Sequence, residues 1–361
     1  MNQAQLERFV VYLQKENWLV FGPVSVPMES KPEEEISPYV ATHPSAKKNQ
    51  DLILIKQIQK PAELVLDERL PFFSFKRFFV PEYETMFEYQ GVKLNDVADI
   101  DITAMKERER IALIGVSLLD LKAINLYEQI FEKDPYYQAR RKKILTVGYS
   151  LVPEIENNFF EYKYEEDILE HLPFDIFLAA KGQKDYRVFS GSIRGQRILE
   201  HFGYKDYEHI QFSGPVREGK LDKQMVLLRD KLKNKHTPKI WEELGNICIE
   251  CGKCTIACPT CFCFRIDEEP SLKENSGVRS RCWDACFYQE FSEVAGPDVS
   301  GRGKPKFLNN TAQRIHFWYF HKFARIPDEF DFMGCVGCRR CARVCPVGID
   351  ITKVLKSIEE S

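Results

Sequence analysis

Two copies of one cysteine motif constrain this chain more strongly than any other feature of its sequence. Each copy has the spacing C-x2-C-x2-C-x3-C and is followed directly by a proline. The first copy consists of Cys248, Cys251, Cys254 and Cys258. The second consists of Cys335, Cys338, Cys341 and Cys345. A repeated motif of this kind predicts two metal centres of the same type.

The distribution of cysteines separates the chemistry of the two halves of the chain. All twelve cysteines lie between Cys248 and Cys345, and the first 247 residues contain none. Disulfides persist in oxidising compartments, for which the sequence offers no support. A zinc site uses two C-x2-C pairs around one ion, which would leave half of the eight motif cysteines unused and the prolines unexplained. The motifs therefore indicate iron–sulfur clusters.

The spacing has a physical meaning for a [4Fe–4S] cube, which needs a thiolate at each of its four iron corners. Three cysteines at x2 intervals allow one short loop to wrap three corners. The fourth cysteine lies beyond an x3 gap, on a helical turn that leads away from the same cube. In two-cluster ferredoxins this fourth cysteine ligates the other cluster.

Carried over to this chain, that arrangement assigns crossed ligand sets. The first cube is expected to be held by Cys248, Cys251, Cys254 and Cys345. The second is expected to be held by Cys335, Cys338, Cys341 and Cys258. Crossed ligation keeps the two cubes close together and joins the two motifs into one folding unit, because metal binding supplies folding energy.

Four further cysteines lie outside the two motifs. They are Cys261, Cys263, Cys282 and Cys286. Together they offer four thiolates to a possible third metal site, although C-x-C is a tight spacing for a cube because side chains alternate on an extended segment. The alternative is that these thiols pack against the other clusters as small apolar groups.

The cysteine-free half shows the alternation of strands and helices that is typical of an α/β layer. An apolar stripe at residues 6, 9, 10 and 13 predicts an amphipathic helix over residues 3–20. Buried strands are predicted from residues 51, 110, 143, 175 and 187, with a helix after the second of them. Ser192 is expected to cap another helix. The order of the strands stays open.

The cysteine-bearing half is predicted to be mostly helical. Thr237 and Pro238 form an N-cap and first-turn pair, and apolar residues recur at helical spacing over 311–326 and 350–358. The predicted fold class is therefore α+β, with an α/β scaffold and docking domain at residues 1–236 and a helical two-cluster ferredoxin domain at residues 237–361. The basic segment 229–239 is interpreted as a solvated linker or as a docking surface for an acidic partner.

Composition excludes several classes of protein. The formal net charge is −3, whereas nucleic-acid binding calls for a clearly basic surface. No apolar run reaches the length of a membrane span, and the first residues lack the features of a secretory signal. We therefore expect no nucleic-acid partner, no membrane insertion and a cytoplasmic location.

The cysteine-bearing segments resemble a known family. The segments PTCFCF, RCWDACF, FHKF and FMGCVGCRRCARVCPVGID are similar to the C-terminal half of 4Fe–4S dicluster electron-transfer subunits. This family includes the beta subunits of NAD(P)-linked hydrogenases (sulfhydrogenases) and the corresponding electron-transfer subunits of anaerobic sulfite reductases. A weaker resemblance runs through ALIGVSLLDLKAI, DPYYQARR and VFSGSIRGQRIL.

The resemblance implies a role in electron transfer without catalytic residues of the chain's own. It places two [4Fe–4S] clusters between a flavin-bearing NAD(P)H-reductase subunit and a terminal catalytic subunit. FAD and NAD(P) would then lie on the partner. Hydrogenase is the leading complex, and a sirohaem sulfite reductase is the alternative. The sequence does not settle the terminal reaction, the potentials of the clusters or the direction of electron flow.

A different class of function also stays open at this point. The chain could be a self-contained flavin- or NAD(P)-dependent iron–sulfur oxidoreductase. No G-x-G-x-x-G motif follows a predicted strand, and the segment GSIRG at Gly191 is a weak phosphate-loop candidate that is better explained as the start of a helix.

Overall fold

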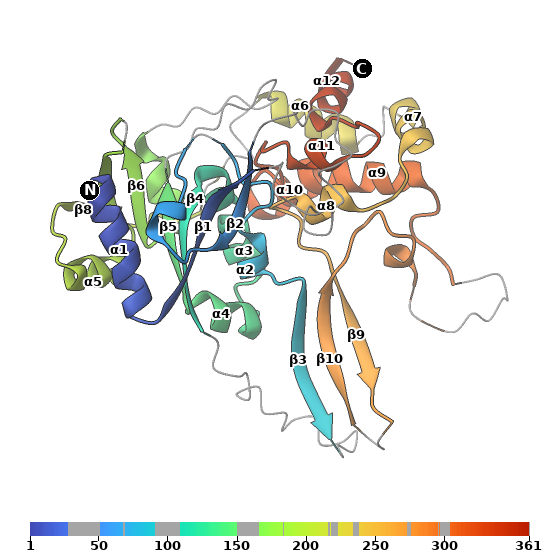
Figure 1. Ribbon diagram of the computed structural model, residues 1–361. Helices are drawn as coiled ribbons and strands as arrows, with labels where there is room; N and C mark the ends of the chain where they lie inside the picture. The colour runs from blue at the N-terminus through green and yellow to red at the C-terminus, as the bar shows by residue number, and fades with distance from the viewer. Residues whose placement is uncertain are drawn as a thin grey trace.

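A computed structural model of the protein describes most of the chain. The described residues are 1–27, 51–67, 69–90, 109–149, 166–182, 184–215, 217, 223–233, 238–272, 276–294, 296 and 304–360. They form a seven-stranded sheet, a three-stranded sheet and helices, in an order that places most strands before the cysteine motifs. Figure 1 shows the seven-stranded sheet on one side of the molecule and the cysteine-bearing helices on the other.

The seven-stranded sheet is mixed, with a parallel centre. Its order is β2-β1-β4-β5-β6-β7-β8. Strands β1, β4, β5 and β6 are parallel neighbours, β2 and β7 join them antiparallel, and β8 is parallel to β7. The bounds are Trp18–Val26 (β1), Leu52–Gln57 (β2), Arg110–Ser117 (β4), Ile144–Tyr149 (β5), Ile176–Ala180 (β6), Tyr186–Ser190 (β7) and Tyr207–His209 (β8).

Most of the predicted elements of this half are present, with one correction at the N-terminus. The first helix, α1, covers Gln3–Lys15 and does not continue to residue 20. Strand β1 begins at Trp18, after Asn17 adopts a left-handed conformation with φ of 59°. The apolar stripe ends at Leu13, so the helical period gave no support for the last five residues of the predicted helix.

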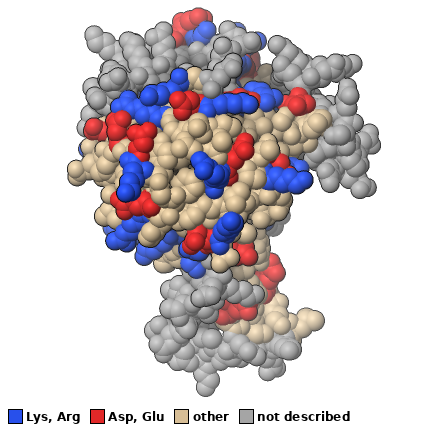
Figure 2. Space-filling view, turned by 60° about the vertical axis from the view of Figure 1, so that its left-hand side comes forward, with Lys and Arg blue, Asp and Glu red and all other residues tan. Residues whose placement is uncertain are grey.

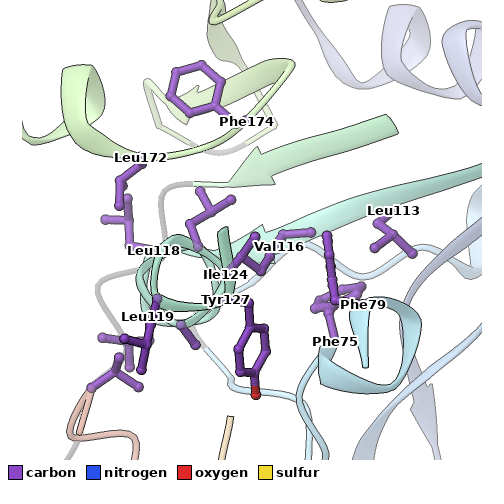
Figure 3. Close-up of a cluster of buried hydrophobic side chains, with 14 of the residues drawn as sticks. Phe75, Phe79, Leu113, Val116, Leu118, Leu119, Ile124, Tyr127, Leu172 and Phe174 are labelled. Carbon is purple, nitrogen blue, oxygen red and sulfur yellow. The ribbon is translucent and has the colours of Figure 1, made fainter. Parts of the chain in front are cut away.

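Helices cover both faces of the sheet because apolar side chains alternate along its central strands. Ala112 and Ile114 of β4 face a core shared with α1 and with α5 (Ile193–Phe202). Leu113 and Val116 face the opposite core, which contains α3 (Leu118–Ile130) and α2 (Lys76–Phe79). Figure 3 shows this second core, with aromatic and aliphatic side chains gathered around α3.

Caps fix the starts of the helices that follow the strands. Ser117 accepts a hydrogen bond from the Asp120 amide at the start of α3, and Ser192 accepts one from the Gly195 amide at the start of α5. The predicted cap at Ser192 is thus confirmed. Helix α4 (Pro135–Arg141) begins in the same way, with Asp134 as its cap.

The three-stranded sheet joins segments that lie far apart in the sequence. Strand β3 (Tyr83–Gln90) pairs antiparallel with β10 (Ser276–Trp283), which pairs with β9 (Phe264–Pro270). Figure 1 shows these strands projecting from the body of the molecule as an arm. The hairpin β9–β10 lies between the two cysteine motifs and adds strands to the predicted helical half.

The cysteine-bearing half packs its own core of helices. The bounds are Lys223–Lys233 (α6), Pro238–Ile247 (α7), Lys253–Ala257 (α8), Thr311–Phe320 (α9), Ile326–Phe330 (α10), Arg340–Val344 (α11) and Ile351–Glu360 (α12). Apolar residues of α6, α7, α9 and α12 form one buried cluster with Cys258, Cys261 and Cys286. The helix predicted from Ile240, with Pro238 in its first turn, is present as α7; its predicted cap, Thr237, lies outside the described residues.

The α+β fold class and the helical character of the ferredoxin half are confirmed. The predicted domain boundary at residues 236 and 237 lies outside the described residues and stays a prediction. The two halves share a core, since Phe332, Val336 and Cys338 pack with residues of α3. Within the described ranges, no helix has both the length and the apolar character needed to cross a bilayer.

The surface charge fits the mixed composition of the chain. Figure 2 shows acidic and basic side chains interspersed on the face turned toward the viewer. Ion pairs between exposed side chains include that of Arg187 with Glu208, whose nitrogen and oxygen atoms lie 2.6 Å apart.

Candidate iron–sulfur sites

The two cysteine motifs fold in the same way. In each, a residue with positive φ precedes a five-residue helix: Gly252 (70°) before α8 and Arg339 (53°) before α11. The third cysteine lies within that helix. The fourth cysteine, Cys258 or Cys345, is the C-cap and adopts an extended conformation. The fourth cysteine was predicted to lie on a helical turn, whereas in both motifs it follows the helix as an extended residue.

Backbone amides point at several of the cysteine sulfurs. The Glu250 amide donates to Cys248 Sγ at 3.4 Å, and the Gly337 amide donates to Cys335 Sγ at the same distance. The Ile349 amide donates to Cys345 Sγ at 3.3 Å. Such N–H···S bonds stabilise thiolates and tune the potential of a cluster.

The first group of thiols combines three cysteines of the first motif with the last cysteine of the second. We call Cys248, Cys251, Cys254 and Cys345 the first site. Burial raises the pKa of the Cys254 thiol, and the other three thiols of the set raise it further. Cys248 likewise has Cys251 and Cys345 as charged neighbours. These four side chains are therefore close in space, although Cys345 is far from the others in sequence.

The second group has the reciprocal composition. We call Cys335, Cys338, Cys341 and Cys258 the second site. Burial raises the pKa of Cys341, and Cys258, Cys335 and Cys338 add to the effect. Burial also raises the pKa of Cys335, to about 12, with Cys258 and Cys338 among its neighbours. Packing of α8 against α11 brings the two sites side by side.

The two sites differ in their access to solvent. A pocket with an apolar lining borders all four cysteines of the first site, whereas Cys341 alone of the second site lines it. At its rim, Ile249 is 61% exposed and Val347 is 38% exposed. Cys258 and Cys338 of the second site are buried. The first site therefore lies nearer to the surface of the molecule.

The arrangement of the cysteine thiols suits a cluster, whose ligands bind at separate corners, better than a single metal ion. A tetrahedral zinc ion needs its thiolates about 2.3 Å from one point, whereas a cube takes one thiolate at each of four separate corners. In the described part of the chain, no three His, Cys, Asp or Glu side chains are arranged to hold a single metal ion. All eight motif cysteines are free of disulfides.

Comparisons with known proteins agree with this geometry. Residues 247–349 match the model of the 4Fe-4S dicluster domain. The chain carries a 4Fe–4S dicluster domain. It is also 28% identical over 320 residues to sulfhydrogenase 2 subunit beta of Pyrococcus furiosus, a match that covers 84% of this chain and 88% of that relative. No solved structure matches the chain. The predicted iron–sulfur cofactors and the resemblance to dicluster electron-transfer subunits are thereby confirmed.

A buried lysine serves the second site of the dicluster domain. Lys322 is 2% exposed. Its Nζ donates to Cys258 Sγ at 3.2 Å, to Thr260 Oγ1 at 2.9 Å and to the Gly334 carbonyl at 2.8 Å. Burial alone would lower the pKa of Lys322, but the thiols of Cys258, Cys261 and Cys335 raise it well above its usual value. The ammonium is therefore fixed against the Cys258 thiol of the second site.

Local structure explains how Lys322 reaches this position. It lies in a π-helical turn, η7 (His321–Arg325), between α9 and α10. Pro327 follows the turn and has no N–H with which to continue an α-helical ladder. Gly334 packs against the same turn, where a side chain would place its Cβ 2.6 Å from the Lys322 carbonyl oxygen. Turns of this kind recur at functional positions.

A buried ion pair joins the dicluster domain to the α/β layer. Arg340 of α11 is fully buried and donates to both carboxylate oxygens of Asp120, at 2.6 and 3.1 Å. Its Nε donates to the Pro71 carbonyl at 3.1 Å. Burial would lower the pKa of Arg340, yet Asp120 and Cys338 raise it. Arg340 thus links a second-site thiol to α3.

The sequence analysis identified the motif cysteines but missed Lys322, which contacts Cys258, and Asp120, which pairs with Arg340. Lys322 lies in FHKF, a segment that carries the resemblance, and this was the available signal. Asp120 gave none beyond its place in the first turn of a helix. Of the four extra cysteines, Cys261 lies beside Cys258 of the second site, Cys263 lies beside Cys286, and Cys282 lies on β10, beside Asp267.

Proposed function

We propose that this chain is the electron-transfer subunit of a multisubunit oxidoreductase, with one [4Fe–4S] cluster at the first site and one at the second. When bound, such clusters accept and release single electrons. The chain sets their positions, their access to solvent and the charges around them. The observation that carries the proposal is the pair of thiol groups, each made from both motifs and packed side by side.

The exposed rim of the first site supports its use as a docking point for a redox partner. Ile247, Ile249 and Val347 are exposed apolar residues beside the motif cysteines. Exposed apolar side chains in contact with a functional group mark interaction sites. A partner seated there would remove water from the first site and shorten the path of the electron.

The relative from Pyrococcus furiosus supports our choice of complex. A beta subunit of a sulfhydrogenase supports a hydrogenase-type complex, with FAD and NAD(P) on a reductase subunit and the terminal chemistry on another chain. We place the complex in the cytoplasm. The contacts of this chain account for holding clusters and give no evidence of a flavin or nucleotide site at GSIRG, where Ser192 instead caps α5.

Purification of the native complex tests the proposal. Chains that co-elute with this protein should include a flavin-bearing reductase and a nickel-bearing subunit. A sirohaem-bearing subunit in place of nickel would assign the chain to sulfite reduction. Flavin bound to the isolated chain, with turnover of NAD(P)H by that chain alone, would contradict the role of a non-catalytic subunit.

Ile249→Glu should slow electron exchange with the partner by roughly 10- to 100-fold, because a carboxylate desolvated in an apolar interface costs about 1–3 kcal/mol. The rate can be followed as bleaching of cluster absorbance after the reduced partner is mixed with the variant. The iron content should not change, since Ile249 supplies no ligand.

Ile193→Glu is the matched control. Ile193 is also an exposed isoleucine, 68% exposed, but it begins α5 on the far side of the sheet. The rate of electron exchange between the Ile193→Glu variant and the partner should equal that of the unmodified chain. Equal slowing by both substitutions would place the docking surface elsewhere.

A further inference from the structure

Trp318 of α9 is a buried residue whose polar atom has no hydrogen-bond partner within the described part of the chain. The residue is 5% exposed and belongs to the core of the cysteine-bearing half. Its indole Nε1 is buried and makes no hydrogen bond with the described residues. An indole N–H is a donor only, and a buried donor without an acceptor destabilises a fold. An acceptor is therefore expected beside this ring.

The ring of Trp318 forms part of the wall of the pocket that borders the first site. All four cysteines of the first site line the same pocket. Besides the thiols, Trp318 and Tyr319 carry the side-chain donors among the described residues that line it. The indole N–H thus belongs to an apolar wall that encloses the four thiols.

Contacts between α9 and the first cysteine motif hold Trp318 in this position. The carboxylate of Glu250, which lies within that motif, accepts from Thr311 Oγ1 at 2.7 Å and from Arg314 Nε at 2.9 Å. Arg314 is 3% exposed and precedes Trp318 by four residues, so the two side chains lie on one face of α9. The face of the helix that holds the motif loop therefore also carries the indole ring.

The π face of the same ring is occupied by a different group. Lys322 Nζ lies over the ring, 5.4 Å from its centroid, and it also donates to Cys258 Sγ of the second site. A cation in this position interacts with the face of the ring. The Nε1–H lies in the ring plane, so the contact with Lys322 does not satisfy it.

We propose that Trp318 Nε1–H donates a hydrogen bond to a sulfur atom of the iron–sulfur cluster in the first site. The inference rests on the proposed function, which places a [4Fe–4S] cluster there. Cluster sulfurs accept N–H bonds, and such bonds tune the potential of the cluster. The backbone already supplies one donor of this kind, from the Glu250 amide to Cys248 Sγ.

The bond would give each cluster one side-chain donor. Reduction adds negative charge to a cluster, and a donor at its sulfur stabilises that charge. Lys322 supplies a charged donor at the second site, whereas Trp318 would supply a neutral one at the first. Trp318 would therefore raise the potential of the first-site cluster without changing the net charge around it.

Pulsed electron paramagnetic resonance of the unmodified chain tests the contact directly. The full chain is prepared with tryptophan labelled with ¹⁵N at the indole nitrogen, reconstituted anaerobically with ferrous iron and sulfide, and reduced. A nitrogen that donates to a cluster sulfur should show a hyperfine coupling to the electron spin of the reduced cluster. The chain contains four tryptophans. The coupling should therefore disappear in Trp318→Phe and remain in Trp241→Phe.

Trp318→Phe should also make the first-site cluster harder to reduce. Phenylalanine keeps an aromatic face for Lys322 and removes the N–H. At a fixed potential, the ratio of reduced to oxidised first-site cluster should fall roughly three- to tenfold, as expected for the loss of one hydrogen bond. The same ratio for the second-site cluster should not change.

Trp241→Phe is the matched control for loss of packing. Trp241 is 6% exposed and belongs to the same core, where its ring centroid lies 5.3 Å from that of Tyr319. It is not among the described residues that line the pocket of the first site. The substitution removes the same volume, and both ratios should keep their unmodified values.

Several results would overturn the contact while leaving the two-cluster assignment intact, provided that each chain holds about eight irons. One is the absence of a ¹⁵N coupling in the labelled unmodified chain, a measurement that involves no variant. Another is an equal fall of both ratios in Trp318→Phe, or the same fall in Trp241→Phe. A fall in Tyr319→Phe with none in Trp318→Phe would place the donor on Tyr319. Failure of the unmodified chain to bind clusters would contradict the proposed function itself, and the contact with it.

Discussion

Cys345→Ala should empty the first site, although the substituted residue belongs to the second motif. Loss of one thiolate removes a corner ligand, and a [4Fe–4S] cluster with three cysteines in a pocket that borders solvent is readily lost. We expect iron to fall by about four per chain. The free energy of unfolding should fall as well, because bound metal contributes folding energy. Iron analysis and chemical denaturation under anaerobic conditions measure both effects.

The reciprocal variant probes the second site. Cys258→Ala should remove the cluster of the second site through loss of one corner thiolate, so iron content alone would not distinguish the two variants. Their remaining clusters differ in one respect: only the second site contacts Lys322. The potential of the cluster left in Cys345→Ala should therefore respond to Lys322→Met, and the potential of the cluster left in Cys258→Ala should not. The double variant C248A/C345A distinguishes the ligation schemes: it should keep about four irons, because both residues belong to the first site, and loss of all iron would show that each motif binds its own cluster.

The features that could be predicted from the sequence are those that depend on residues only a few positions apart. The strands at residues 110 and 144 are runs of buried apolar residues, and their neighbours in the sheet are also their neighbours in sequence. The stripe at residues 6–13 and the cap at Ser192 depend on side chains three or four residues apart. The cysteine motifs are equally local, since each fixes a five-residue helix and its extended C-cap.

The pairing of strands that are distant in the sequence could not be predicted, for a physical reason. Strands β3 and β9 are polar along much of their length, so their sequences show no alternation of core-facing apolar residues. Both pair with β10, and the pairing of β3 with β10 joins segments that are far apart in the sequence. Strand β1 contains Gly22 and Pro23, residues that argue against a central strand when read alone. It is nevertheless flanked on both sides, by β2 and β4.

The burial of charged side chains also could not be predicted from the sequence. Arg340 could be interpreted equally well as a residue near a cluster or as an ordinary surface charge. Its complete burial depends on Asp120, 220 positions away, and nothing in the local sequence reports that pairing. The same is true of Lys322, whose three acceptors come from segments on either side of it in the chain. Residues that tune a cluster were thus harder to find than residues that hold it.

Lys322→Met should lower the reduction potential of the second-site cluster by roughly 60–130 mV. Reduction adds negative charge to the cluster, and the buried ammonium stabilises that charge through its hydrogen bond to Cys258. A hydrogen bond to a charged group contributes about 1.5–3 kcal/mol, and about 1.4 kcal/mol corresponds to roughly 59 mV for a single electron. Methionine keeps the length and the apolar part of the side chain and removes the charge. Redox titration followed by electron paramagnetic resonance measures the shift.

Arg325→Met is the matched control for this substitution. Arg325 belongs to the same π-helical turn and also carries one positive charge, but its side chain is 63% exposed and faces Glu329. Solvent and salt screen an exposed charge, so its removal should leave both potentials within about 15 mV, a few tenths of a kcal/mol. The potential of the first-site cluster should hold steady in both variants. A shift of equal size at both sites in Lys322→Met would mean that the lysine acts through the fold rather than through its contact with Cys258.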